Sequence, residues 1–180
     1  NVIWGGLETN FSQRNEDGRP RKFNAGFVAS QGQWISGGCG AGRIYKSLMP
    51  KYRFFDDERH FYSLRKVAQD LSLNEGALIK PFKAEVRGQE FSIGLTICED
   101  IWSDDYNLHP ANILAGRGAN IVINISASPF TWKKNEKRHR VVREVIKYCH
   151  VPLIYCNCVG LQNNLKNYLS FDGRSTVYSA

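Results

Sequence analysis

Cys98 is the residue of this chain that is best placed, by its neighbours, to perform covalent chemistry. It follows residues 91–97 (FSIGLTI), an apolar and β-branched run that predicts a buried strand, and it precedes Glu99 and Asp100. The chain turns outward at the end of such a strand, and the backbone N–H groups of the turn can stabilise an oxyanion. A thiolate at this point would attack a carbonyl carbon. Cys98 alone is equally compatible with an inert cysteine of the core, the commoner role of a free cysteine.

A lysine in a second segment supplies what a nucleophilic cysteine needs. Lys46 begins the stretch KSLMPKY, in which Pro50 constrains the backbone, and FDDERHF follows at residues 55–61. An ordinary thiol is only a few per cent ionised at neutral pH, and a nearby ammonium group favours the thiolate. We therefore predict Lys46 and Cys98 as catalytic residues.

Taken in order, the two segments resemble the nitrilase superfamily of carbon-nitrogen hydrolases, whose members use a Glu-Lys-Cys triad to hydrolyse amides and nitriles. Lys46 matches the family's lysine and Cys98 its cysteine. The resemblance is strongest to one branch, the glutaminase domain of glutamine-dependent NAD synthetase. Four ordered blocks carry it, at residues 46–61, 98–102, 124–130 (NISASPF) and 171–175 (FDGRS).

The resemblance implies roles for further residues. Tyr52 would line the glutamine pocket, Trp102 would pack near the nucleophile, and Ser128 would help to hold the amino-acid end of the substrate. Each also has a purely structural interpretation, as a core aromatic or as a turn residue. Where the family commonly has Phe-Asp-Glu, Asp57 occupies the position of the glutamate and Glu58 follows one residue late, so both are candidates for a second acid.

The implied reaction hydrolyses the side-chain amide of glutamine through a cysteine thioester and supplies ammonia for NAD synthesis. We expect the synthetase domain to be a partner absent from this chain, no cofactor in this domain, and ATP and Mg only in the partner. Two alternatives stay open: a stand-alone nitrilase-type amidase acting on another small amide, or a catalytically incomplete scaffold.

The triad's glutamate is expected outside this chain. In the family it lies upstream of the segment that residues 2–6 match, so the chain would begin after it as a fragment of a longer protein. Glu8 and Glu16 are the acids nearest to the start, and both fall in a polar stretch that favours solvated side chains.

Composition agrees with one enzyme domain over residues 1–180. The chain has 180 residues, 42% of them hydrophobic, which suffices for a substantial core. It shows no apolar run of about 20 residues and no signal peptide, so we expect a cytoplasmic location without membrane contact. The net charge of +7 comes without a nucleic-acid recognition motif, and we predict no nucleic-acid partner, solvated basic residues over 133–140, and a homo-oligomer.

Cysteine and glycine patterns do not add a second site. The chain has five cysteines, an odd number that argues against a disulfide framework. Cys156 and Cys158 alone would supply at most two ligands, fewer than a metal site needs, and we predict no metal site. The stretch SGGCGAGR at residues 36–43 lacks the Lys-Ser/Thr of a nucleotide loop and is interpreted as a glycine-rich hairpin.

The order of elements predicts an α/β protein with a mixed sheet covered by helices. We expect a loop over 10–21 and helices over 59–71, 107–115 and 133–150. Strands are expected over 2–7, 23–29, 77–85, 90–97, 120–125, 153–158 and 169–178, with a hairpin over 34–45. The family resemblance implies a nitrilase-like four-layer α-β-β-α sandwich that lacks its N-terminal segment here.

Overall fold

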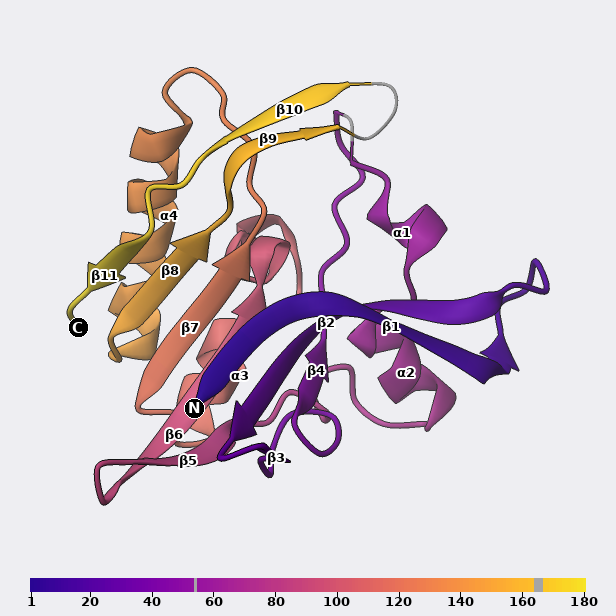
Figure 1. Cartoon of the computed structure of the whole chain (residues 1–180), viewed down its shortest axis with the longest axis horizontal. Helices are drawn as coiled ribbons and strands as arrows, with labels where there is room; N and C mark the ends of the chain where they lie inside the picture. The colour runs from indigo at the N-terminus through magenta and orange to yellow at the C-terminus, as the bar shows by residue number, and fades with distance from the viewer. Residues whose placement is uncertain (54, 164–166) are drawn as a thin grey trace.

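A computed structural model describes residues 1–53, 55–163 and 167–180. Its first sheet is antiparallel, with the order β1-β2-β3 and with β4 also paired to β2 (Figure 1). The strands are β1 (Val2–Arg14), β2 (Pro20–Ser30), β3 (Gln33–Trp34) and β4 (Arg43–Tyr45). The loop predicted over 10–21 is wrong in extent, because β1 and β2 continue pairing until Arg14 faces Pro20.

The second sheet carries the predicted mixture of parallel and antiparallel strands, in the order β11-β8-β7-β6-β5. Its strands are β5 (Phe82–Val86), β6 (Gln89–Ile97), β7 (Ile121–Ser126), β8 (Leu153–Asn157) and β11 (Thr176–Tyr178). The central β6, β7 and β8 are parallel, and both edge strands are antiparallel to their neighbours.

A separate hairpin of β9 (Val159–Asn163) and β10 (Tyr168–Asp172) extends from the second sheet (Figure 1). The single strand predicted over 169–178 is therefore wrong. The chain breaks between β10 and β11 at Gly173 and Arg174, which adopt positive φ angles of 64° and 61°. Positive φ ends an extended strand because it reverses the local direction of the backbone.

The helices are short except for the last: α1 (Asp57–His60), α2 (Leu64–Asp70), α3 (Pro110–Gly116) and α4 (Lys134–Cys149). The helix predicted over 59–71 is interrupted at Phe61, which is extended. Tyr62 then donates its backbone N–H to the Lys22 carbonyl of β2 at 2.7 Å, and Ser63 caps α2 through the backbone N–H of Lys66. Tertiary hydrogen bonding to the first sheet therefore outweighs local helix propensity here.

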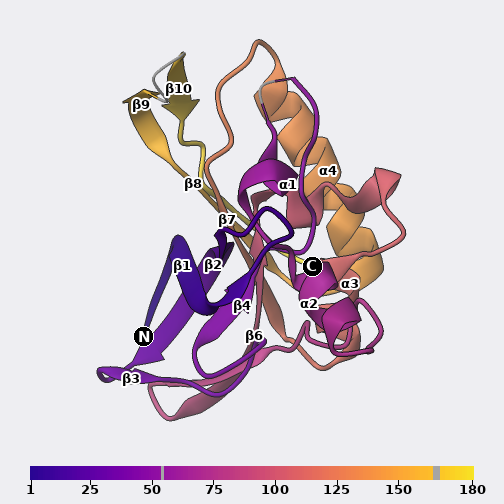
Figure 2. The same cartoon turned by 90° about the vertical axis from the view of Figure 1, so that its right-hand side faces the viewer.

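The second sheet is buried on both faces, as its apolar sequence predicts. Ile93, Leu95 and Ile97 of β6 belong to the core that also contains residues of β2 and β4. The other face carries Val122 and Leu153, which pack with residues of α3 and α4. Figure 2 shows the first sheet on one side of the second sheet and α3 and α4 on the other.

Close approach of the two sheets requires a glycine in β2. A Cβ atom added to Gly26 would lie 2.9 Å from Leu95 Cδ2 of β6, closer than carbon atoms normally pack. The glycine-rich segment over 36–43 is a tight turn into β4, in agreement with its interpretation as a hairpin. Gly38 has a φ of 62°, and a Cβ there would lie 2.0 Å from the Arg43 carbonyl oxygen.

The parallel strands bring their carboxyl ends to one edge of the sheet. Ile97 pairs with Ile125, and Ser126 pairs with Asn157, so the residues that follow β6, β7 and β8 meet there. Ligands of open α/β sheets bind at this edge. Within the described ranges, none of the helices has the length and apolar character needed to cross a bilayer.

Candidate active site

Cys98 lies at the point where β6 ends and a short 3₁₀ helix, η1 (Cys98–Ile101), begins. Its φ is 46°, a left-handed value that is costly for a residue with a Cβ atom. Strain of this kind persists only where the surrounding structure enforces it, and it is concentrated at functional sites. Cys98 lines a cavity of about 1090 Å³.

The Lys46 ammonium group is buried and fixed by one carboxylate. The side chain is 4% exposed, and its Nζ lies 2.5 Å from Asp57 Oδ2. Burial acts to lower the pKa of Lys46, but the negative charges of Cys98 and Asp57 outweigh it and the pKa is raised. Glu58 instead pairs with Lys51 on the surface. Of the two candidate second acids, the structure thus brings Asp57 to Lys46.

Opposing charges act on the Cys98 thiol. Burial raises its pKa, Lys46 lowers it, and the neighbouring Glu99 raises it again, with a net upward shift. The raised pKa favours the protonated thiol at neutral pH, so a general base is needed to take its proton when it attacks. The Lys46 charge limits the cost of that ionisation.

Glu99 is a site residue that sequence reasoning did not select, although it adjoins Cys98. It lines the same cavity and is 5% exposed. Its carboxylate accepts hydrogen bonds from the Tyr52 hydroxyl at 2.8 Å and from the Tyr106 hydroxyl at 3.3 Å. Burial raises the pKa of Glu99, and the bond from Tyr52 partly offsets this shift. Tyr52, predicted to line the substrate pocket, thus lies on the cavity wall beside Glu99.

Asp100 joins the two segments that carry Cys98 and Lys46. Its Oδ1 accepts the backbone N–H groups of Ser47 at 3.0 Å and Leu48 at 2.9 Å, and its Oδ2 accepts that of Ile97 at 3.0 Å. Burial raises the pKa of Asp100 to about 6, although these three hydrogen bonds oppose the shift. The position of the carboxylate after Cys98 in the sequence is explained by this bridge.

Ser128 is held at the cavity wall by hydrogen bonds to Asn157 and Arg138. Its backbone N–H donates to Asn157 Oδ1 at 2.8 Å, and its carbonyl accepts from Arg138 at 2.9 Å. Arg138 also forms a salt bridge with Asp172 at 2.9 Å. The structure therefore brings together Cys98, Tyr52, Ser128 and Trp102 around one cavity, with Lys46 and Asp57 behind the nucleophile.

The prediction that the basic residues over 133–140 are solvated is wrong for two of them. Arg138 is 2% exposed and ion-paired, as described above. Lys134 lines the cavity, and its pKa is lowered by burial, against which the negative charge of Cys98 acts. The position of Lys134 in the sequence could have indicated that it lies at the cavity. Lys134 comes shortly after the NISASPF block, which begins in β7, the strand next to β6.

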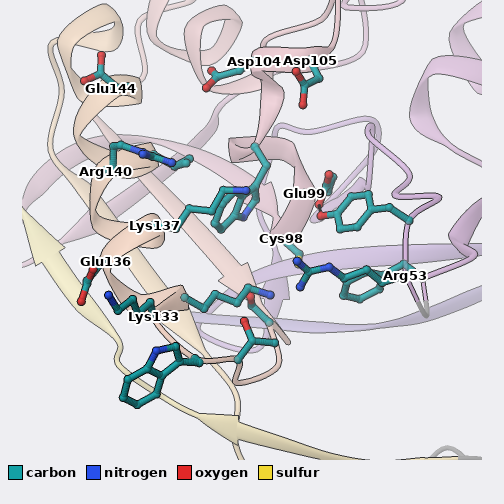
Figure 3. A pocket seen from close by; sticks show the side chains of 18 residues that line it. Arg53, Cys98, Glu99, Asp104, Asp105, Lys133, Glu136, Lys137, Arg140 and Glu144 are labelled. Carbon is teal, nitrogen blue, oxygen red and sulfur yellow. Dashed lines mark hydrogen bonds between the residues drawn. The ribbon is translucent and has the colours of Figure 1, made fainter.

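Charged groups line the outer part of the cavity from both sides. Figure 3 shows Lys137 and Arg140 of α4 on one side, Glu99 and Arg53 on the other, and Cys98 between them. The Lys137 ammonium lies 5.4 Å from the centre of the Trp102 ring, a distance at which the ring attracts a cation. Trp102 thus lines the cavity together with Cys98 and contacts the basic face of α4 through Lys137.

Glu8 lies elsewhere in the molecule and not in a solvated loop as predicted. It belongs to β1, accepts a hydrogen bond from the Tyr45 hydroxyl at 2.8 Å, and lies 3.3 Å from Arg43. Neither Glu8 nor Glu16 lines the cavity with Cys98. Among the described residues, no group of three or more His, Cys, Asp or Glu side chains is arranged to hold a metal ion.

Curated proteins similar in sequence share one name. The chain is 32% identical over 184 residues to a glutamine-dependent NAD(+) synthetase of Synechocystis sp., with 97% of the chain and 28% of the relative covered. A glutamine-dependent NAD(+) synthetase of Thermotoga maritima is 31% identical over 160 residues, which cover 88% of the chain and 23% of the relative. The chain thus spans about a quarter of the length of these relatives. No family model matches the chain.

Solved structures agree with these sequence similarities. The glutamine-dependent NAD+ synthetase from Acinetobacter baumannii aligns with a TM-score of 0.66 and 26% identity, covering 98% of this chain and 27% of that one. A carbon-nitrogen hydrolase from Helicobacter pylori G27 aligns with a TM-score of 0.70 and 23% identity, covering 98% and 54%, which supports the fold alone. The chain has the nitrilase-like fold, and nearly its whole length is similar in sequence to a part of the glutamine-dependent NAD synthetases.

Proposed function

We propose that this chain hydrolyses the side-chain amide of glutamine to glutamate and ammonia. The observation that carries the proposal is the placement of Cys98, which has a positive φ at the end of β6, lines a cavity, and lies within the electrostatic influence of the buried Lys46–Asp57 pair. A cysteine so placed is suited to covalent catalysis on a carbonyl group. The names of the sequence relatives support glutamine as the source of the amide.

In the proposed reaction the Cys98 sulfur attacks the carboxamide carbon of glutamine after a general base removes the thiol proton. The Lys46 ammonium and the backbone N–H of Glu99 stabilise the tetrahedral oxyanion. The intermediate expels ammonia, which takes up the proton held by the base, and a thioester to Cys98 remains. Water then hydrolyses the thioester, which releases glutamate and restores the thiol. We propose that this base is the glutamate of the family's Glu-Lys-Cys triad.

Two charged side chains fit the amino-acid end of glutamine. Glu99 is buried at the cavity wall and would pair with the α-ammonium group, while Lys134 would pair with the α-carboxylate. Ser128 and Tyr52 lie on the same cavity wall and would contact the substrate between these groups. A small amide that lacks both charges would leave Glu99 and Lys134 partly desolvated without an oppositely charged group of the substrate, which is costly. We therefore propose selectivity for glutamine over simple amides.

The ammonia would serve a synthetase domain that is separate from this chain. The names of the relatives support this proposal, and the chain covers only about a quarter of their length. We propose that ATP and Mg act only in that domain, and that the protein is cytoplasmic and forms a homo-oligomer.

The substrate assignment is tested in the full-length protein by measuring glutamate release and ammonia release. Glu99→Gln and Lys134→Met should each raise KM for glutamine by about tenfold or more, as expected for loss of a charged partner. Lys147→Met is the matched control, since Lys147 lies on the same helix and pairs with Glu144 at the surface. Equal turnover of glutamine and of an uncharged aliphatic amide by the unmodified protein would contradict the proposal and favour a general amidase.

A further inference from the structure

A tyrosine hydroxyl buried behind Cys98 lacks a hydrogen-bond partner. Tyr155 lies on β8 and is 1% exposed, and its hydroxyl oxygen makes no hydrogen bond to any group in the described ranges. Burial of an unpaired hydroxyl costs free energy, and a phenylalanine of nearly the same shape would avoid that cost. A function for the hydroxyl is therefore needed to explain it.

Tyr155 belongs to a row of polar residues that crosses the sheet beneath the nucleophile. Thr96 pairs with Asn124, and Asn124 pairs with Tyr155, across the parallel strands β6, β7 and β8. The Asn124 amide group donates to Thr96 Oγ1 at 3.0 Å and to the Cys98 carbonyl at 3.4 Å. Ser126 donates its hydroxyl proton to Asn124 Oδ1 at 2.7 Å. Asn124, the middle residue of the row, thus contacts the backbone of Cys98 directly.

The Ser126 hydroxyl lies close enough to the Cys98 sulfur and to the Tyr155 hydroxyl to influence the pKa of both groups. Burial raises the pKa of Cys98 and Lys46 lowers it, and among the smaller effects a hydrogen bond from the Ser126 hydroxyl favours the thiolate. Burial also raises the pKa of Tyr155, and the same Ser126 hydroxyl acts against that shift. A serine hydroxyl has a single proton and two acceptor sites, so it cannot donate to Asn124 and to the sulfur at the same time.

We propose that Ser126 and Tyr155 are positioning residues for the Cys98 thiolate. When the general base removes the thiol proton, the Ser126 hydroxyl turns from Asn124 to the sulfur and donates a hydrogen bond to it. The Tyr155 hydroxyl then donates to the Ser126 oxygen, which gains an acceptor role in this orientation. No proton is transferred among these groups, and Ser126 returns to Asn124 when the sulfur becomes acylated and neutral.

The arrangement gives the unpaired Tyr155 hydroxyl a partner in the state in which the sulfur is charged. Hydrogen bonds in series strengthen one another, so the bond from Tyr155 makes Ser126 a better donor to the thiolate. The inference rests on the proposed role of Cys98 as nucleophile, and it adds two residues that do not line the cavity.

The test measures the rate of Cys98 alkylation by iodoacetamide as a function of pH in the full-length protein, with the modified residue identified by peptide mass. We expect Ser126→Ala to slow alkylation at neutral pH by about tenfold and Tyr155→Phe by about threefold, with both profiles shifted to higher pH. The double variant should match Ser126→Ala alone, because Tyr155 acts through Ser126.

Tyr178→Phe is the matched control, since the Tyr178 hydroxyl contacts His139 of α4 at 2.5 Å and should leave the profile unchanged. Circular dichroism checks folding, and Tyr155→Phe retains the ring that packs in the core. Unchanged profiles in both single variants would overturn the inference, as would a further loss in the double variant. Alkylation needs no glutamine, so this result is independent of the Cys98→Ala assay that decides the proposed function.

Discussion

The Lys46 Nζ lies 2.5 Å from Asp57 Oδ2, and the lysine side chain is 4% exposed while that of Asp57 is 16% exposed. A buried ammonium group without a partner would lose its proton or open the structure, and the carboxylate prevents both. Asp57 therefore keeps a positive charge at a fixed position beside the Cys98 thiol. Both partners of this ion pair belong to the segment 46–61, and its lysine lowers the pKa of the Cys98 thiol.

Asp57→Asn should remove the carboxylate that stabilises the buried Lys46 ammonium group, whereas Glu58→Gln should leave that ion pair intact. Loss of one partner of a buried pair leaves the other uncompensated, and we expect Asp57→Asn to destabilise the chain by about 3 kcal/mol. Glu58 pairs with the exposed Lys51, and its removal should change stability by less than about 0.5 kcal/mol. Urea unfolding of the two variants measures the difference. Equal effects would refute the assignment of Asp57 as the acid that serves Lys46.

Lys46→Met should reduce glutamate release by at least about a hundredfold, the size expected when a stabiliser of the oxyanion is lost. It should also slow alkylation of Cys98 at neutral pH, because Lys46 lowers the pKa of that thiol. Lys51→Met serves as the control, since Lys51 is exposed. If Lys46→Met and Lys51→Met behave alike in both assays, Lys46 has no catalytic role.

Asp100 should make stability depend on pH in an identifiable window. Burial raises its pKa from 3.8 to about 6, so the folded chain binds a proton that the unfolded chain releases in this interval. The contribution of Asp100 is complete below about pH 4 and is lost as the pH rises through about 6. Two pKa units correspond to about 3 kcal/mol.

Asp100→Asn provides the measurement. The difference in free energy of unfolding, unmodified chain minus variant, should fall as the pH rises between about 4 and 6. The variant should also be less stable at neutral pH by about 1–3 kcal/mol, because the amide cannot accept all three backbone N–H groups. A difference that stays constant or rises with pH would show that the pKa of Asp100 is not raised.

Local patterns were sufficient to predict the elements that mount Cys98. The apolar run over 91–97 is β6, the strand over 120–125 is β7, and the residues after both meet at one edge because the strands are parallel. Parallel strands that are buried on both faces have continuous apolar sequences, which are easily recognised. Lys46 was predicted from the need of a thiolate for a nearby ammonium group, whereas the predictions of Tyr52, Trp102 and Ser128 came from the family resemblance.

Features set by distant contacts could not be predicted in this way. The break at Phe61 depends on a hydrogen bond from Tyr62 to β2. The burial of Arg138 and the position of Lys134 at the cavity depend on how α4 packs over the sheet. Glu99 adjoins Cys98 in sequence, but its role depends on Tyr106 and Tyr52, which approach from different segments. From sequence alone a charged side chain is predicted to be exposed to solvent, because the residues that would pair with it in the interior are not known.

Glutamate release by the Cys98→Ala variant of the full-length protein tests the central claim most directly. We expect hydrolysis of glutamine to be abolished, while activity driven by free ammonia in the synthetase domain is retained. Cys156→Ala, which removes a thiol on the neighbouring strand β8, should leave glutamate release unchanged. Glutamate release that survives Cys98→Ala within about tenfold, or only about 1.4 kcal/mol of activation free energy, would contradict Cys98 as the nucleophile.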